Sequence, residues 1–130
     1  MKQMIWLVAS GVTLASTLAL AQPAKIGTTP AGDILEAPGG HALYVYDGDK
    51  IDLGQQGKSS CNGECAQRWP PFSAGVDAQS MGDWGIILRE DGSRQWTYKG
   101  RPLYTWTQDT APGQINGNGY QGNKWHVAKP

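Results

Sequence analysis

A ten-residue pattern occurs twice in this chain, and the two copies lie 60 positions apart. They cover residues 40–49 and 100–109, and both read Gly-x-x-Leu-Tyr-x-aromatic-x-x-Asp. Each copy continues through a polar, glycine-rich loop to a tryptophan, Trp69 or Trp125. An internal repeat indicates one supersecondary unit used twice, and such units bury their apolar faces against each other. We therefore expect two similar halves, about 33–75 and 84–129.

The first 21 residues have the pattern of a secretory signal peptide. Lys2 precedes an almost wholly apolar run over residues 4–20, and Ala19-Leu20-Ala21 forms a small-x-small cleavage site before Gln22. The run is at the lower limit for a spanning helix, so cleavage is favoured over a retained anchor and no membrane span is expected afterwards. Residues 22–32 are expected to be a flexible leader, followed by a single β domain over 33–130.

Composition favours strands over helices. The 18 glycines and 8 prolines indicate many turns, and no stretch has the pattern of an amphipathic helix of ordinary length. Within 42–46, alternation predicts a strand that points Leu43 and Val45 to one side and Tyr44 and Tyr46 to the other. We expect a mainly β fold: a small antiparallel β domain of two tandem repeats, with one short helix over 62–68 near the cysteine pair. The net charge is zero and the sequence has no basic cluster that would argue for a nucleic-acid partner.

Cys61 and Cys65 form the sharpest local motif. Cysteines four apart on a helical turn face the same way, and their Cα atoms come within disulfide range. Export to an oxidising compartment favours a structural disulfide. Two alternatives remain open: a soft-metal site, such as a copper site, that adds His41 and His126, and a thiol-redox role. Copper is the one cofactor considered.

The repeated positions and the aromatic rows are the other candidate sites. Each aspartate of the pattern can fix its turn or contact a ligand together with a tyrosine. Trp96 and Tyr98 share a strand face that is either core or a groove for a sugar, haem or peptide, and glycan binding at Trp96 or Trp106 is a related option. A calcium site at Asp47, Asp49 and Asp52 is a weaker alternative, because the spacing departs from the usual calcium loop. The repeat-motif residues are Tyr44, Tyr46, Asp49, Tyr104, Trp106 and Asp109.

Taken together, these segments resemble a bacterial secreted-repeat family of unknown function. The resemblance is carried by residues 43–49, 61–66, 69–71 and 95–104, and it extends over about 31–129. Members are described as predicted lipoproteins with a Tyr-x-(Phe/Trp/Tyr)-x-x-Asp motif. The resemblance implies an exported domain of two such repeats with no established activity.

The resemblance and the residues together set the functional expectation. Many members carry a lipidated cysteine after the signal, whereas this chain has Gln22 there, so we expect a soluble periplasmic or secreted protein. No nucleophile elbow or zinc-protease motif is present. We expect a non-enzymatic domain that binds a ligand or partner, such as a cell-envelope component. The rival hypothesis is a periplasmic metal-binding or thiol-redox protein that uses the Cys-x-x-x-Cys pair.

Overall fold

The computed structural model describes residues 3–5, 9–11, 21–51 and 57–130. Within these residues, seven short strands form three small antiparallel sheets with the orders β1-β2, β3-β7 and β4-β5-β6. The expectation of a mainly β antiparallel fold is confirmed. The helices and strands are β1 (Lys25–Thr29), β2 (Gly32–Glu36), β3 (Tyr44–Tyr46), α1 (Glu64–Arg68), β4 (Trp84–Leu88), β5 (Arg94–Tyr98), β6 (Arg101–Pro102), α2 (Tyr120–Asn123) and β7 (Trp125–Val127).

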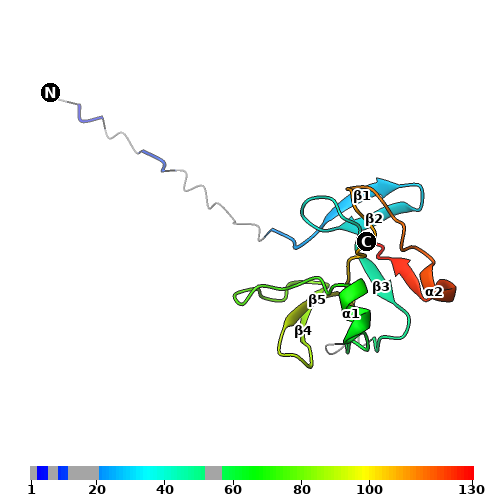
Figure 1. Ribbon diagram of the computed structural model, residues 1–130. Helices are drawn as coiled ribbons and strands as arrows, with labels where there is room; N and C mark the ends of the chain where they lie inside the picture. Colours follow the sequence, from blue (N-terminus) through cyan, green and yellow to red (C-terminus); the bar gives the residue numbers. More distant parts are fainter. Residues whose placement is uncertain (1–2, 6–8, 12–20, 52–56) are drawn as a thin grey trace.

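Each half begins with a β-hairpin, and the two hairpins lie on opposite sides of β3 (Figure 1). The strands β1 and β2 pair from Lys25↔Glu36 to Thr29↔Gly32, and β4 and β5 pair from Trp84↔Tyr98 to Leu88↔Arg94. The second hairpin turns at Gly92, whose φ of 84° suits glycine. Its Asp91-Gly92 sequence is typical of a hairpin turn.

The first hairpin corrects the expectation of a flexible leader over 22–32. Residues 25–29 form β1, which pairs along its whole length with β2. The chain turns at Gly32, which has a φ of 92°, and Thr28 Oγ1 donates to Asp33 Oδ1 at 3.1 Å. The strand was missed because its side chains are exposed or half-buried, so no apolar alternation marks it.

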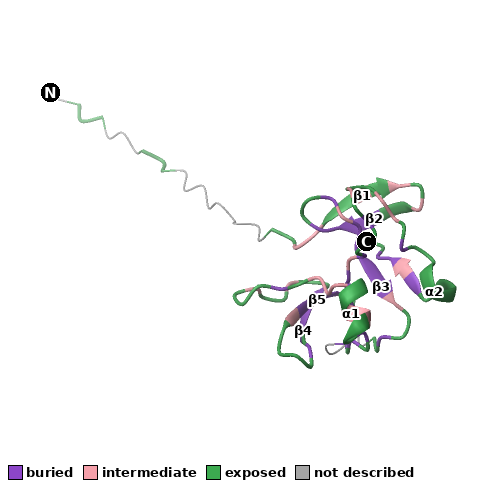
Figure 2. Ribbon diagram, in the orientation of Figure 1, coloured by how far each residue is buried: buried purple, intermediate pink, exposed green. Residues whose placement is uncertain are grey.

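The two motif segments meet in the centre of the molecule. Tyr44 N donates to Tyr104 O at 2.8 Å, and Tyr104 N donates to Tyr44 O at 3.0 Å. These reciprocal bonds relate the two copies by an approximate two-fold axis. Figure 2 shows β3 mostly buried at this position.

The predicted alternation of the first motif strand divides the interior into two clusters. Leu43 and Val45 pack in one cluster, together with Trp84, Trp96 and Leu103. The opposite side of the strand faces an aromatic cluster that contains Tyr44, Tyr104, Trp69, Trp106, Trp125 and Cys61, with Tyr46 packed against it. The expected assignment of side chains to the two faces is therefore confirmed.

The closing segment of each half pairs with the motif strand of the other half. At the end of the chain, β7 pairs with β3 in the register Tyr44↔Val127 and Tyr46↔Trp125. In the same way, Phe72 N donates to Leu103 O at 2.8 Å and Thr105 N donates to Pro70 O at 2.9 Å. The halves are thus interlocked, because the closing segment of each half forms hydrogen bonds with the motif strand of the other half.

Both helices are short and follow the polar loops. The first, α1, is the short helix expected over 62–68, and it begins at Glu64 after Gly63. The second, α2, lies in a segment expected to be loop, and Gln121 and Gly122 inside it have non-helical dihedral angles. It is therefore closer to a pair of tight turns than to a regular helix. In the part of the chain that the structure describes, no helix has the length and apolar character needed to cross a membrane.

Candidate functional site

The tyrosine and aspartate of the repeated motif bind each other across the two halves. Tyr44 Oη donates to Asp109 Oδ2 at 2.5 Å, and Tyr104 Oη donates to Asp49 Oδ2 at 2.6 Å. Both tyrosines are fully buried, and the aspartates are 7 % and 5 % exposed. Bonds this short are typical of hydroxyl groups that donate to carboxylates. The motif thus forms two equivalent buried Tyr–Asp pairs.

Each aspartate also holds the polar loop that follows it. Ser60 N donates to Asp49 Oδ1 at 2.8 Å, and Asn116 N donates to Asp109 Oδ1 at 2.9 Å. The local turns match as well, since the Asp49 and Asp109 amides donate to the carbonyl groups three residues earlier. Each aspartate therefore has the structural role expected at its turn, and it also binds the backbone of the polar loop that follows.

Burial sets the electrostatics of these pairs. Desolvation, followed by the hydrogen bond to Asp109, raises the pKa of Tyr44 well above its usual range. Desolvation and the Asp49 charge raise the pKa of Tyr104 in the same way. The pKa of Asp49 is also raised, mainly by desolvation, although donors from Ser60 and Tyr104 oppose this. Both phenols therefore stay protonated at neutral pH.

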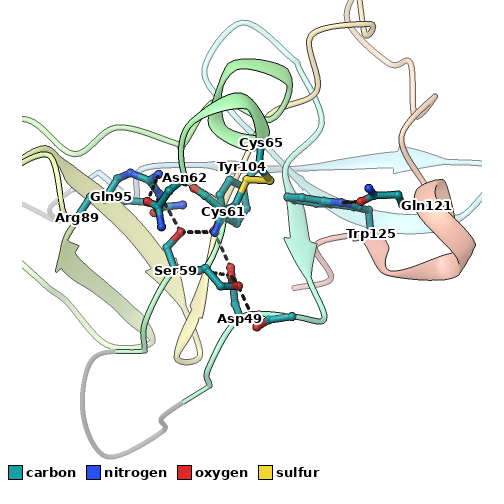
Figure 3. The surroundings of a disulfide bond; sticks show 12 residues. Asp49, Ser59, Cys61, Asn62, Cys65, Arg89, Gln95, Tyr104, Gln121 and Trp125 are labelled. Carbon is teal, nitrogen blue, oxygen red and sulfur yellow. Dashed lines mark hydrogen bonds between the residues drawn. A yellow bond between two sulfur atoms is a disulfide. The ribbon is translucent and has the colours of Figure 1, made fainter.

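A buried guanidinium extends only one of the two pairs. Arg89 is 7 % exposed, and its Nη1 donates to Ser59 Oγ at 2.9 Å and to Gln95 Oε1 at 2.7 Å. Its Nη2 donates to Cys61 O at 2.6 Å and to Asn62 Oδ1 at 3.2 Å (Figure 3). Ser59 Oγ in turn lies 2.7 Å from the hydroxyl oxygen of Tyr104, which connects Arg89 to the Tyr104–Asp49 pair.

The other pair has no such extension, so the two-fold symmetry fails here. By register, Gln95 corresponds to Ile34, because Trp96 N donates to Phe72 O as Leu35 N donates to Ala128 O. The hairpin pairing then aligns Arg89 with Thr29, because Ile87 pairs with Gln95 as Gly27 pairs with Ile34. Ser59 aligns with Ile115, because the next residue in each half donates its backbone N–H to the motif aspartate. A polar cluster in one half thus replaces largely apolar positions in the other. Every described buried side-chain nitrogen and oxygen has a hydrogen-bond partner.

The two cysteines form a disulfide beside this network. The S–S distance is 2.04 Å and the Cα–Cα distance is 5.2 Å. Cys61 is fully buried and borders the aromatic cluster. Figure 3 shows the bridge between the Arg89 network and the ring of Trp125.

The structure does not bring the suggested metal ligands together. Both sulfurs are used in the bridge, and His126 Nε2 lies 2.9 Å from Asp47 Oδ2 at the surface. Among the residues that the structure describes, no group of three or more His, Cys, Asp or Glu side chains could hold a metal ion. Asp52, the third residue of the calcium alternative, lies outside the described residues.

The aromatic row suggested as a ligand face is split between core and surface. Trp96 is 7 % exposed and packs edge-on against Trp84, with ring centroids 6.0 Å apart. Tyr98 on the same strand is only half-buried. Of the expected face, Tyr98 alone is accessible, while the Trp106 side chain is 4 % exposed.

The aromatic cluster contains a stack of four rings that passes through the two-fold axis. Trp69 and Trp125 are almost parallel, with an interplanar angle of 2° and centroids 3.8 Å apart. Tyr46 stacks on Trp125 at 4.5 Å, and Trp106 stacks on Trp69 at 4.0 Å. Gly117 is required beside the stack, since a Cβ there would meet the Trp69 ring at 2.6 Å.

A cationic cleft lies between β7 and the β5–β6 turn, and its volume is about 330 Å³. Its floor is apolar and almost closed to solvent, whereas its rim is mostly basic and carries three exposed cations, Lys99, Arg101 and Lys129. No carboxylate is found among the described residues that line it. Sequence reasoning missed this cleft because its walls come from three distant segments. The floor consists of Val45, Leu103 and Val127, and the rim of Tyr98, Lys99, Arg101, His126 and Lys129.

The fold and the site define a class of small β domains built from two interlocked copies of one hairpin-and-motif unit. A family model for a secreted repeat of unknown function matches residues 25–73 and 85–129. The chain belongs to this secreted-repeat family, as its motif residues indicated. Comparisons with curated proteins and with solved structures gave no match.

Proposed function

We propose that the protein is an exported, non-enzymatic binding domain that takes an anionic ligand of the cell envelope in its cationic cleft. The family match supports export, and residues 1–21 have the pattern of a signal peptide. The observation that carries the proposal is the convergence of Lys99, Arg101 and Lys129 on one cleft of a chain whose net charge is zero.

The polar groups of the motif favour a binding role over a catalytic one. A reactive pair must be within reach of a substrate, but the Tyr–Asp pairs are buried and already joined to each other. The guanidinium of Arg89 is likewise surrounded by acceptors from the protein itself. These groups stabilise the fold, so recognition is left to the surface.

The cleft has the features needed to hold a small anionic group. Lys99 and Arg101 form no ion pair with any described residue, and Lys99 Nζ lies 5.3 Å from the centroid of the Tyr98 ring. Lys129 lines the side of the cleft formed by β7 and the residues after it, and its Nζ contacts Ala31 O in the β1–β2 turn. A volume of about 330 Å³ is near the lower end for ligand sites, which suits one acidic unit of a larger molecule.

The test is an NMR titration of the mature protein with glucuronate and inorganic phosphate, with glucose as the uncharged control. We expect saturable shifts of the cleft amides for the two anions, weakened by salt, and none for glucose. Replacing Lys99, Arg101 and Lys129 by glutamine should weaken anion binding by about tenfold or more, because the charges that attract the ligand are lost.

A matched variant separates the cleft from net charge. Replacing the exposed Lys25, Lys58 and Lys124 by glutamine removes the same charge at positions outside the cleft. This variant should bind the anions as the wild type does. Equal weakening in both variants, or shifts by glucose as large as those by the anions, would refute the proposal.

A further inference from the structure

Five aromatic rings form a continuous path from the half-buried Tyr46 to the exposed Tyr120. The four-ring stack occupies most of the path, and Tyr120 extends it with its centroid 4.8 Å from that of Trp106. Tyr120 is 42 % exposed. No side chain separates successive rings, because the centroids are 3.8–4.5 Å apart in the stack and 4.8 Å apart at the tilted Trp106–Tyr120 contact.

The motif tyrosines touch this path from the side. The Tyr104 ring meets Trp125 edge-on, with centroids 5.1 Å apart, and the Tyr44 ring meets Trp69 in the same way at 5.3 Å. Each phenol therefore contacts both an indole of the central pair and a carboxylate that can accept its proton. This combination arises twice, once on each side of the two-fold axis.

Ordinary core packing does not require this combination. A buried phenol needs one acceptor, which a backbone carbonyl could supply, and aromatic pairs prefer offset-stacked or edge-on contacts over a face-to-face sandwich. Here an oxidisable stack, two phenols and two proton acceptors lie in direct contact. Electron exchange between aromatic groups falls steeply with distance, so rings in contact are coupled strongly.

We propose that the stack is a one-electron relay that carries an oxidising equivalent from the surface at Tyr120 to the motif tyrosines. The oxidant is an outer-sphere one-electron acceptor that docks at the exposed end and is itself reduced by one electron. The near-parallel Trp69–Trp125 pair shares the resulting positive charge between two indoles. This role adds to the binding function and does not depend on it.

The relay ends in a proton-coupled step at a Tyr–Asp pair. Tyr104 gives one electron to the oxidised stack, and its phenolic proton crosses the 2.6 Å hydrogen bond to Asp49 Oδ2. The products are a neutral stack, a neutral tyrosyl radical and a protonated carboxyl group. The step reverses when the reduced acceptor returns its electron and Asp49 returns the proton. The Tyr44–Asp109 pair can perform the same step.

The test is flash photo-oxidation of the mature, disulfide-bonded protein by a ruthenium(III) polypyridyl complex. Transient absorption and electron paramagnetic resonance follow the indole and tyrosyl radicals. In the wild type we expect an indole cation radical that converts to a tyrosyl radical, with the conversion slowed in D₂O because a proton moves with the electron.

Three double variants locate the path. Trp69→Phe with Trp125→Phe should abolish most of the tyrosyl radical, whereas Trp84→Phe with Trp96→Phe, a matched change in the other core cluster, should leave it unchanged. Tyr44→Phe with Tyr104→Phe keeps the stack, so the indole radical should form and persist without conversion. Circular dichroism and a disulfide assay establish that each variant is folded.

Several results would overturn the relay. These are a tyrosyl yield unaffected by Tyr44→Phe with Tyr104→Phe, an equal loss of radical in both tryptophan variants, or a wild-type conversion with the same rate in H₂O and D₂O. If the Trp69→Phe, Trp125→Phe variant does not fold, the tyrosine variant and the isotope comparison still decide the question. Loss of anion binding at the cleft would leave the relay result unchanged.

Discussion

Tyr44 and Tyr104 place a hydroxyl group beside a carboxylate in a site that water does not reach. Polar groups are costly to bury unless each donor and acceptor has a hydrogen-bond partner. Here each pair joins a tyrosine of one half to an aspartate of the other half. The residues that repeat most clearly in the sequence are therefore those that join the two copies. Their contribution to stability depends on the phenols remaining protonated.

This dependence predicts alkaline instability. Because the pKa values of Tyr44 and Tyr104 are raised in the folded state above the ordinary value of 10.0, the folded state retains two protons that the unfolded chain loses. The associated stability is fully present below pH 10 and is lost as the pH rises above it. Urea unfolding measured from about pH 8 to about pH 12 should show this decline, since the range brackets the ordinary pKa of tyrosine.

The control for the alkaline decline is Tyr44→Phe with Tyr104→Phe. This variant should be less stable at neutral pH, since two buried carboxylates lose a donor, by about 1–3 kcal/mol for each pair. It should also show a clearly weaker dependence on alkaline pH. A decline as steep as that of the wild type would assign the effect to other groups.

At the scale of elements, α1 and the disulfide fix the loop that carries the Arg89 network. Arg89 Nη2 binds the carbonyl oxygen of Cys61, so the bridge and the guanidinium hold the same backbone segment. The corresponding position in the second half is occupied by Gly117, and α2 there has no bridge. The polar loop of the first half is thus held by a disulfide, whereas the corresponding loop of the second half is held by its packing against the aromatic stack.

Removing the bridge should therefore be costly but not fatal to the fold. Closing so small a loop contributes about 2 kcal/mol by chain entropy. We expect Cys61→Ala with Cys65→Ala to lower the free energy of unfolding by about that amount, as measured by urea denaturation. Treating the wild type with dithiothreitol under the same conditions should give the same loss, while the double variant should not respond to the reductant. A response of the variant would contradict this explanation.

Some elements were predictable from sequence and others were not, for physical reasons. The strand around Tyr44 was predicted because one of its faces is aliphatic and the other aromatic, and β5 because Trp96 and Tyr98 alternate with polar residues. The strand β1 was missed because it lies at an edge with little burial. The partners of the motif side chains were also missed, because a repeat reveals which positions are equivalent but not which copy each one contacts.

At the scale of the whole molecule, the exchange of closing segments makes the two halves depend on each other. Residues 69–73 complete the second motif strand, and β7 completes the first. The cationic cleft follows from the same arrangement, since its walls combine β7 with the β5–β6 turn. This explains why the cleft could not be recognised from local sequence.

The interlocking predicts that neither half folds alone. Residues 22–78 and 79–130, produced as separate chains, should each lack near-ultraviolet circular dichroism, because the Trp69–Trp125 stack needs both. Mixing the two should restore the signal and produce a one-to-one complex on size exclusion. A cooperative thermal transition in either fragment alone would contradict this.

The exchanged closing segments also bear on how such a chain could arise. A single copy of the unit would leave its motif strand without a neighbouring strand and its closing segment without a strand to pair with. Two identical copies would provide both partners if they exchanged their closing segments about a two-fold axis. A protein with only one of these repeats should therefore exist as a symmetric homodimer. Fusion of two such genes would yield a two-repeat chain like this one, in which Arg89 and the cysteines could then diverge in one half only.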